Sequence, residues 1–434
     1  MKRWFLFTLM GGALLVSANM SAQDTGRGLA AETATASVSA PSAVSAIAAD
    51  SALVAEATPQ PDSAFVISLL TCSPGQEVYE LYGHTAIRVR SAARGIDQVF
   101  NYGVFSFEQP HFIWRFVLGQ CDYMVVPQDF CDFIAEYAQR GSSVTEQVLN
   151  LNSSEASALA SDLYSNILPE NREYRYNIFR NNCTTKARDI IEANIRGNVV
   201  YPVRPQRNSF RTILYEFTEG HPWAREGNDL LLGVTVDTAI VERDEMFSPI
   251  YMMHYADSAF IDAGRKALRP FVSERHELLA ENAERQALAA GQLPQVPFTP
   301  AALAWSILAA GVLLALFELL HGRIIWPIDA VLLTLQSLAG VLLTFMSVAS
   351  EHPGVASNWQ IWVLNPLPLF FFYAIIKADI RRQGHVYHTI AAAWLLTFVA
   401  LYFVVPQHFS QSILPVALLL LSRAIVHILV YRKS

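Results

Sequence analysis

The sequence predicts an α+β domain with a small antiparallel sheet, followed by an all-α transmembrane domain of five helices. Of the 434 residues, 52% are hydrophobic and only 16% are charged, and the mean hydropathy is +0.27. Soluble domains usually carry about a quarter of charged residues. The apolar excess is concentrated beyond residue 300. A net charge of −7 without any basic region excludes a nucleic-acid-binding protein.

The N-terminus has the pattern of a secretory signal peptide, which we place at residues 1–22. Lys2 and Arg3 precede an apolar run, and small residues end it at Ala22. The alternative is an uncleaved membrane anchor. Residues 23–63 are rich in Ala, Ser and Thr without helical or strand periodicity, which predicts a flexible spacer.

Residues 64–263 alternate between strand and helix patterns and form the predicted extracytoplasmic domain. Short apolar or alternating runs bounded by turn residues predict strands at 65–70, 85–90 and 98–103. Amphipathic spacing and cap candidates predict helices at 77–82, at 128–140, at 154–168 and after Asn182. The charged residues 264–299 predict an amphipathic helical connector to the membrane part.

Residues 300–434 contain five apolar stretches, each near the ~20 residues that a helix needs to cross a bilayer. Lys and Arg occur in alternate connections, and the connections 351–358 and 407–410 contain none. The positive-inside rule therefore predicts a cytoplasmic C-terminus. Arg423 and His427, on one face of the last span, indicate either a function inside the membrane or snorkelling near its edge. The predicted spans are 301–320, 327–349, 359–376, 388–405 and 411–430.

His84 and Cys183 are the residues best suited to chemistry. His84 enters a predicted strand, and Cys183 opens a predicted helix, whose N-terminus favours a thiolate. A Cys–His pair is the minimum for covalent acyl transfer, and a third group must orient the imidazole. Asn101 lies across the predicted hairpin from His84, and Asp97 is the alternative further along it. The plainer interpretation is a core histidine and an inert buried cysteine.

Cys72, in a Ser-Pro-Gly turn, is the rival nucleophile or a structural cysteine. Four cysteines allow three pairings, and none are spaced as in a zinc ribbon. A disulfide at Cys183 would remove the proposed nucleophile. If any bond exists, we therefore favour Cys121–Cys131.

The order His…Asn…Cys is the reverse of the papain order and resembles the circularly permuted papain-like fold of lecithin:retinol acyltransferase. A longer set of motifs, over about residues 65–260, resembles the Lnb-type lipoprotein N-acyltransferases of Bacteroidetes. The C-terminal membrane domain suits the same family. The motifs are Cys72-Ser73-Pro74-Gly75, Tyr82-Gly83-His84-Thr85-Ala86-Ile87-Arg88-Val89, Asn101-Tyr102-Gly103-Val104-Phe105, Leu149-Asn150-Leu151, Pro169–Asn177 and Asn182-Cys183-Thr184-Thr185.

The resemblance implies an enzyme that moves an acyl chain from a membrane phospholipid to the α-amine of the diacylglyceryl-cysteine of bacterial lipoproteins. Cys183 would carry the chain as a thioester, His84 would be general base and acid, and Asn101 would orient His84. The Cys183 N–H would stabilise the oxyanion. The partners would be the bilayer, its phospholipids and diacylated lipoproteins, without a cofactor or a metal. The protein would be a multi-pass inner-membrane protein with its catalytic domain in the periplasm.

Arginines and a tyrosine before Cys183 are candidates for contacting a lipid phosphate, because Arg binds phosphate bidentately. They are Arg172, Arg175 and Tyr176, and the alternative is pairing with Glu170 and Glu173. Arg88 and Arg90 are expected on a solvated strand face. Two other functions remain open: a membrane-anchored papain-like cysteine amidase or peptidase of the cell envelope, and a non-enzymatic assembly or sensor protein.

Overall fold

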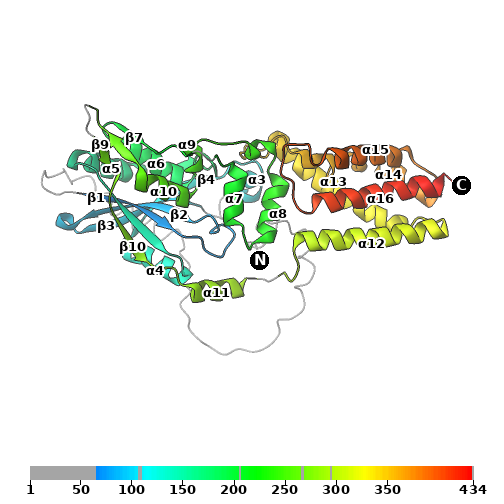
Figure 1. The fold of residues 1–434 in the computed structure, drawn as a ribbon, viewed down its shortest axis with the longest axis horizontal. Helices are drawn as coiled ribbons and strands as arrows, with labels where there is room; N and C mark the ends of the chain where they lie inside the picture. Colours follow the sequence, from blue (N-terminus) through cyan, green and yellow to red (C-terminus); the bar gives the residue numbers. More distant parts are fainter. Residues whose placement is uncertain (1–64, 106–109, 205–206, 265–267, 294–295, 433–434) are drawn as a thin grey trace.

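The computed structural model describes residues 65–432 except 106–109, 205–206, 265–267 and 294–295. The molecule is elongated, with an α+β domain at one end and a bundle of apolar helices at the other (Figure 1). The fold class predicted from the sequence is therefore confirmed. The predicted signal peptide and spacer lie outside the described residues.

A seven-stranded antiparallel sheet forms the centre of the α+β domain, in the order β10-β5-β1-β2-β3-β4-β6. β1, β2 and β3 coincide with the three predicted strands, and β2 and β3 form a hairpin around the 3-10 turn Ala92–Arg94. The strands are β1 Val66–Cys72, β2 His84–Ser91, β3 Ile96–Val104, β4 Asp122–Asp129, β5 Val144–Leu149, β6 Glu173–Arg175 and β10 Val272–Leu279.

Helices cover both faces of this sheet. On one face, α5 (Ser153–Asn166), α6 (Cys183–Ala193) and α10 (Pro249–Ser258) supply side chains to the main core, against strand residues such as Ile87. On the other, α4 (Phe130–Arg140) packs Phe133 and Tyr137 on a second cluster. Burial on both faces makes β2 almost continuously buried and gives it a rigid position.

The remaining elements of the domain lie around this core. A three-stranded sheet has the order β7-β8-β9. The elements are β7 Asn198–Val200, β8 Phe260–Asp262, β9 Leu268–Pro270, α3 Phe112–Val117, α7 Phe210–Phe217, α8 Pro222–Leu231, η2 Val234–Asp237 and α9 Glu242–Glu245.

The predicted helical connector is wrong over much of its length. Residues 272–279 form β10, which pairs with β5 at the edge of the sheet. Among the described residues of this segment, only α11 (Ala283–Gln292) is helical. The charged side chains of this segment belong to a solvent-exposed edge strand, where charge discourages further strand pairing. The helix predicted at 77–82 is also absent, because these residues form turns.

The membrane part has an apolar helix at each of the five predicted spans. Among the described residues, four segments are long and apolar enough to cross a bilayer, and α15 is shorter. α16 packs against both α12 and α15. The elements are α12 Pro300–His321, α13 Trp326–Ala349, η3 Trp359–Trp362 with α14 Leu367–Ile380, α15 Val386–Leu401 and α16 Ile413–Tyr431.

The two connections without Lys or Arg lie against the α+β domain. The Gly233 N–H donates to the Gly354 carbonyl at 2.7 Å, and the Asn358 amide donates to the Leu230 carbonyl at 2.8 Å. In the second connection, His408 pairs with Asp237 at 2.9 Å. The C-terminal end of α16 lies at the opposite end of the molecule (Figure 1). The two parts thus meet through polar contacts at the end of the bundle that faces the α+β domain.

Two arginines are buried where the sequence suggested solvent contact. Arg88 is not on a solvated face: its guanidinium pairs with Asp97 at 2.6 Å and Glu146 at 3.1 Å, whereas Arg90 is exposed. Arg423 does not snorkel, because it pairs with Asp329 inside the bundle at 2.8 Å. Sequence periodicity missed both because Glu146 and Asp329, their buried partners, come from segments that are distant in the sequence.

Candidate active site

Cys183 is the first residue of α6, and its position is fixed by the helix cap. The Asn182 side chain accepts hydrogen bonds from the N–H groups of Thr184 and Thr185, as an N-cap does. Its amide also donates to the carbonyls of Ile178 and Phe247 at 2.9 and 2.8 Å. Asn182 therefore holds the helix start rigidly, with the sulfur at the positive end of the helix dipole.

His84 is the first residue of β2, and its imidazole lies beside the Cys183 thiol. Burial alone lowers the pKa of His84, but the charge and hydrogen bond of Cys183 and the hydrogen bond of Asn101 outweigh it, so the pKa is raised. Burial likewise raises the pKa of Cys183, but His84 and the Thr85 N–H lower it below its usual value. Both directions favour a thiolate–imidazolium pair.

Asn101, on β3, completes a row of three side chains. Its Oδ1 lies 3.2 Å from Nε2 of His84, which leaves Nδ1 of the imidazole for the sulfur. Its Nδ2 donates to Oε1 of Gln128 on β4 at 3.0 Å, so Gln128 fixes which way the amide faces. Sequence reasoning missed Gln128. The only signal was its place two residues beyond Val126, the partner of Asn101 in the β3–β4 pairing.

Close contacts hold α6 against β2 and β3. The hydroxyls of Thr85 and Thr184 lie 3.0 Å apart and join the strand to the helix beside the two reactive residues. Gly103 has φ +91°, and a Cβ there would lie 3.4 Å from Cβ of Cys183. Gly83 has φ +72°, and a Cβ would come within 2.7 Å of the Cys72 carbonyl. These glycines allow a backbone conformation and an approach that other residues would strain.

His84, Asn101 and Cys183 line a cavity of about 2120 Å³. This is larger than the roughly 300–1,000 Å³ of ordinary small-molecule pockets. Its lining continues from the α+β domain onto the membrane part, through Met346 at the end of α13 and Val355 in the following connection. Cys183 therefore borders a large space that reaches the apolar helices.

The model of the Lnb N-terminal periplasmic domain matches residues 56–213, and that of the Lnb transmembrane domain matches residues 292–434. The chain belongs to the Lnb family. This confirms the resemblance inferred from the motifs. No curated protein and no solved structure gives a significant match. As an Lnb-type protein, the chain is an inner-membrane protein with a periplasmic domain, and the family indicates a membrane enzyme that processes lipoproteins.

In this Lnb-type protein, Cys72 lies behind the site rather than in it. It pairs with His84 in the β1–β2 register but is fully buried, and it does not line the cavity. Burial raises the pKa of its thiol well above the usual range. All four cysteines are free, so the favoured Cys121–Cys131 disulfide is absent from the structure. Asp97, the alternative orienting residue, pairs with Arg88 instead.

The three candidate phosphate ligands of this Lnb chain do not all lie at the cavity. Arg172 and Tyr176 line the cavity, and Nε of Arg172 is buried without a hydrogen-bond partner among the described residues. Arg175 does not line the cavity: it pairs with Asp122 at 2.7 Å and with Glu351 at 3.0 Å. Arg175 thus joins the α+β domain to the connection after α13, and its partners are not the neighbouring glutamates.

Proposed function

We propose that this protein transfers an acyl chain from a membrane phospholipid to the α-amine of the N-terminal diacylglyceryl-cysteine of bacterial lipoproteins. One observation carries the proposal: a Cys–His–Asn row opens into a large cavity whose lining includes residues of the membrane domain. Acyl transfer through a thioester needs a nucleophile, a proton carrier and access to lipid, and it needs no cofactor.

In the first step, the Cys183 thiolate attacks an ester carbonyl of the phospholipid. The C–S bond forms, and the tetrahedral oxyanion is stabilised by the N–H of Cys183, which donates to no acceptor within the described residues. The ester C–O bond then breaks, and the His84 imidazolium gives its proton to the departing glycerol oxygen. A lysophospholipid leaves, and the acyl chain remains on sulfur.

In the second step, the lipoprotein amine attacks the thioester carbonyl. Neutral His84 accepts a proton from the amine as the C–N bond forms, and the C–S bond breaks. The products are an amide and the original thiolate–imidazolium pair. Asn101 keeps the imidazole aligned through both steps, and Arg172 is the proposed ligand of the donor phosphate.

The membrane arrangement supports a lipid donor. In the proposed topology, the C-terminus is cytoplasmic and the connections 351–358 and 407–410 are periplasmic, where both touch the catalytic domain. The cavity then lies at the membrane surface, within reach of two membrane-anchored substrates.

The test is mass spectrometry of a lipoprotein's N-terminal peptide from a strain that lacks other lipoprotein N-acyltransferases. We expect a third acyl chain with the wild-type protein and none with Cys183→Ala or His84→Ala. Cys72→Ala serves as the matched cysteine control and should keep the product. Triacylation that survives Cys183→Ala would overturn the thioester route.

A second measurement separates the transferase from an amidase or peptidase. Purified full-length protein is mixed with phospholipid vesicles, and lysophospholipid is quantified with and without a diacylated lipopeptide. Release of lysophospholipid that increases with the lipopeptide supports transfer. No lysophospholipid, together with cleavage of a peptide, would favour the hydrolase.

A further inference from the structure

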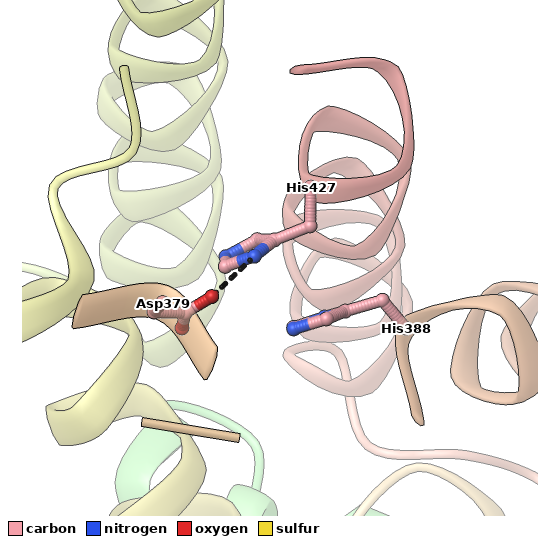
Figure 2. Close-up of side chains that lie close together, drawn as sticks. All are labelled: Asp379, His388 and His427. Atoms are coloured by element: carbon pink, nitrogen blue, oxygen red, sulfur yellow. Dashed lines mark ion pairs between the residues drawn. The ribbon is translucent and has the colours of Figure 1, made fainter. Parts of the chain in front are cut away.

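A second group of reactive side chains lies in the membrane domain, at the end away from the α+β domain. Asp379 in α14, His388 in α15 and His427 in α16 converge there from three helices (Figure 2). Their exposed fractions are 4%, 4% and 1%. None of these residues takes part in the proposed acyl transfer.

The polar atoms of this cluster are poorly satisfied. Five buried side-chain atoms have no well-aligned hydrogen-bond partner among the described residues. They are both carboxylate oxygens of Asp379, Nε2 of His388 and both ring nitrogens of His427. A buried polar group without a partner costs about 1–3 kcal/mol, and most buried groups are paired. One atom from each residue is therefore available to a shared ligand, and these atoms lie close together.

We propose that Asp379, His388 and His427 bind a divalent transition-metal ion, with zinc as the best-matched ion. One ligand atom from each residue lies within 4.8 Å of the others. Nδ1 of His427 and Oδ1 of Asp379 are 3.1 Å apart, close to the ~3.3 Å between neighbouring ligands of a tetrahedral zinc ion with bonds near 2.0–2.1 Å. Two imidazoles and one carboxylate are a donor set that suits such ions.

The surroundings of His427 match those of a metal-binding histidine. A metal-ligating imidazole usually donates its other N–H to a carboxylate, which fixes the tautomer. Oδ2 of Asp329 lies 3.1 Å from Nε2 of His427, which leaves Nδ1 to face Asp379. Asp329 is in turn held by two 2.8 Å hydrogen bonds from Arg423, whose guanidinium also pairs with Glu318.

The residues buried around the cluster also favour a cation. Glu318, Asp329 and Asp379 are buried carboxylates, and Arg423 is the one guanidinium paired with them among the described residues. Three carboxylates beside one guanidinium form an environment that suits a divalent ion.

Space for an additional ligand lies beside the cluster. A cavity of about 20 Å³ is lined by Asp329, His388 and Arg423. A single water needs about 10–15 Å³. Three protein ligands and one water would complete a four-coordinate site, and the ion would join the ends of α14, α15 and α16.

The experiment uses the full-length protein in detergent, stripped with a chelator and then titrated with zinc chloride. Metal content by mass spectrometry should reach one zinc per chain, and zinc should raise the melting temperature. His388→Gln should weaken zinc binding at least roughly tenfold and abolish the thermal shift, as should Asp379→Asn. The matched control is His321→Ala, which removes an exposed histidine at the end of α12 outside the cluster.

His388→Gln is the deciding variant because Nε2 of His388 has no described hydrogen bond to lose, so folding should be retained. A monodisperse stripped wild-type protein that binds no zinc would overturn the proposal. Zinc affinity unchanged in His388→Gln would overturn it as well. Neither readout depends on acyl transfer, so this inference and the proposed function fail or succeed separately.

Discussion

At the scale of single residues, a proton shared between His84 and Cys183 predicts that the alkylation rate of Cys183 has an unusual pH dependence. The pKa of Cys183 is lowered and that of His84 is raised, so the thiolate persists below the pH at which ordinary thiols protonate. Peptide-resolved alkylation of the purified protein should show Cys183 reacting at mildly acidic pH, with the exposed Cys131 as internal reference.

The His84→Ala variant provides the control for this profile. Without the imidazolium, the pKa of Cys183 returns upward, and its alkylation rate near pH 6 should fall roughly tenfold or more. An identical profile in wild type and His84→Ala would show that the two groups do not share a proton.

Gln128 fixes the side chain of Asn101, so we expect its replacement to slow acyl transfer indirectly. Gln128→Leu removes the acceptor that fixes the Asn101 amide and should lower kcat about tenfold, the value of one hydrogen bond of about 1.4 kcal/mol. The measurement is acyl transfer to a diacylated lipopeptide; a KM change with unchanged kcat would contradict the assigned role.

At the scale of the elements, α5 and α6 both begin with an asparagine N-cap of the same kind. Asn152 and Asn182 both form capping boxes, but of the two helices only α6 begins with a cysteine. Replacing either asparagine by Ala should destabilise the protein by about 1 kcal/mol, and more for the buried Asn182. Only Asn182→Ala should also slow alkylation of Cys183. Equal alkylation in both variants would show that the cap does not position the sulfur.

The elements that the sequence predicted are those with strong local signals. The strand at His84 and the helix at Cys183 follow from alternation and cap residues, and the proximity of Asn101 follows from the short hairpin. β10 was missed because its charged residues suit an exposed helix as well as an edge strand, and only pairing with β5 decides between them. Gln128 and the Asp379 cluster depend on contacts between distant segments, which local patterns do not contain.

At the scale of the whole molecule, Arg211 is a buried charge close to the junction of the two parts. Its guanidinium pairs with Asp229 and Asp237 at 2.7 Å, and Asp237 also contacts His408 of the membrane domain. Arg211→Ala removes the guanidinium from two buried carboxylates and should destabilise the protein by roughly 3–5 kcal/mol.

The matched control is Arg243→Ala, since the Arg243 side chain is 51% exposed and its surface pairs are worth about 0–1 kcal/mol. Thermal unfolding of the two full-length variants in detergent measures the difference. Similar melting temperatures for both would show that the Arg211 network does not stabilise the junction.

The edge position of β10 has a consequence for the order in which the protein is made. β10, the edge strand beside β5, follows every other described strand in the sequence, and α11 lies between it and the first apolar helix. The sheet that holds His84 and Asn101 is therefore completed only once the ribosome has reached the membrane part. Assembly of the reactive site and entry of the chain into the bilayer are adjacent events in synthesis.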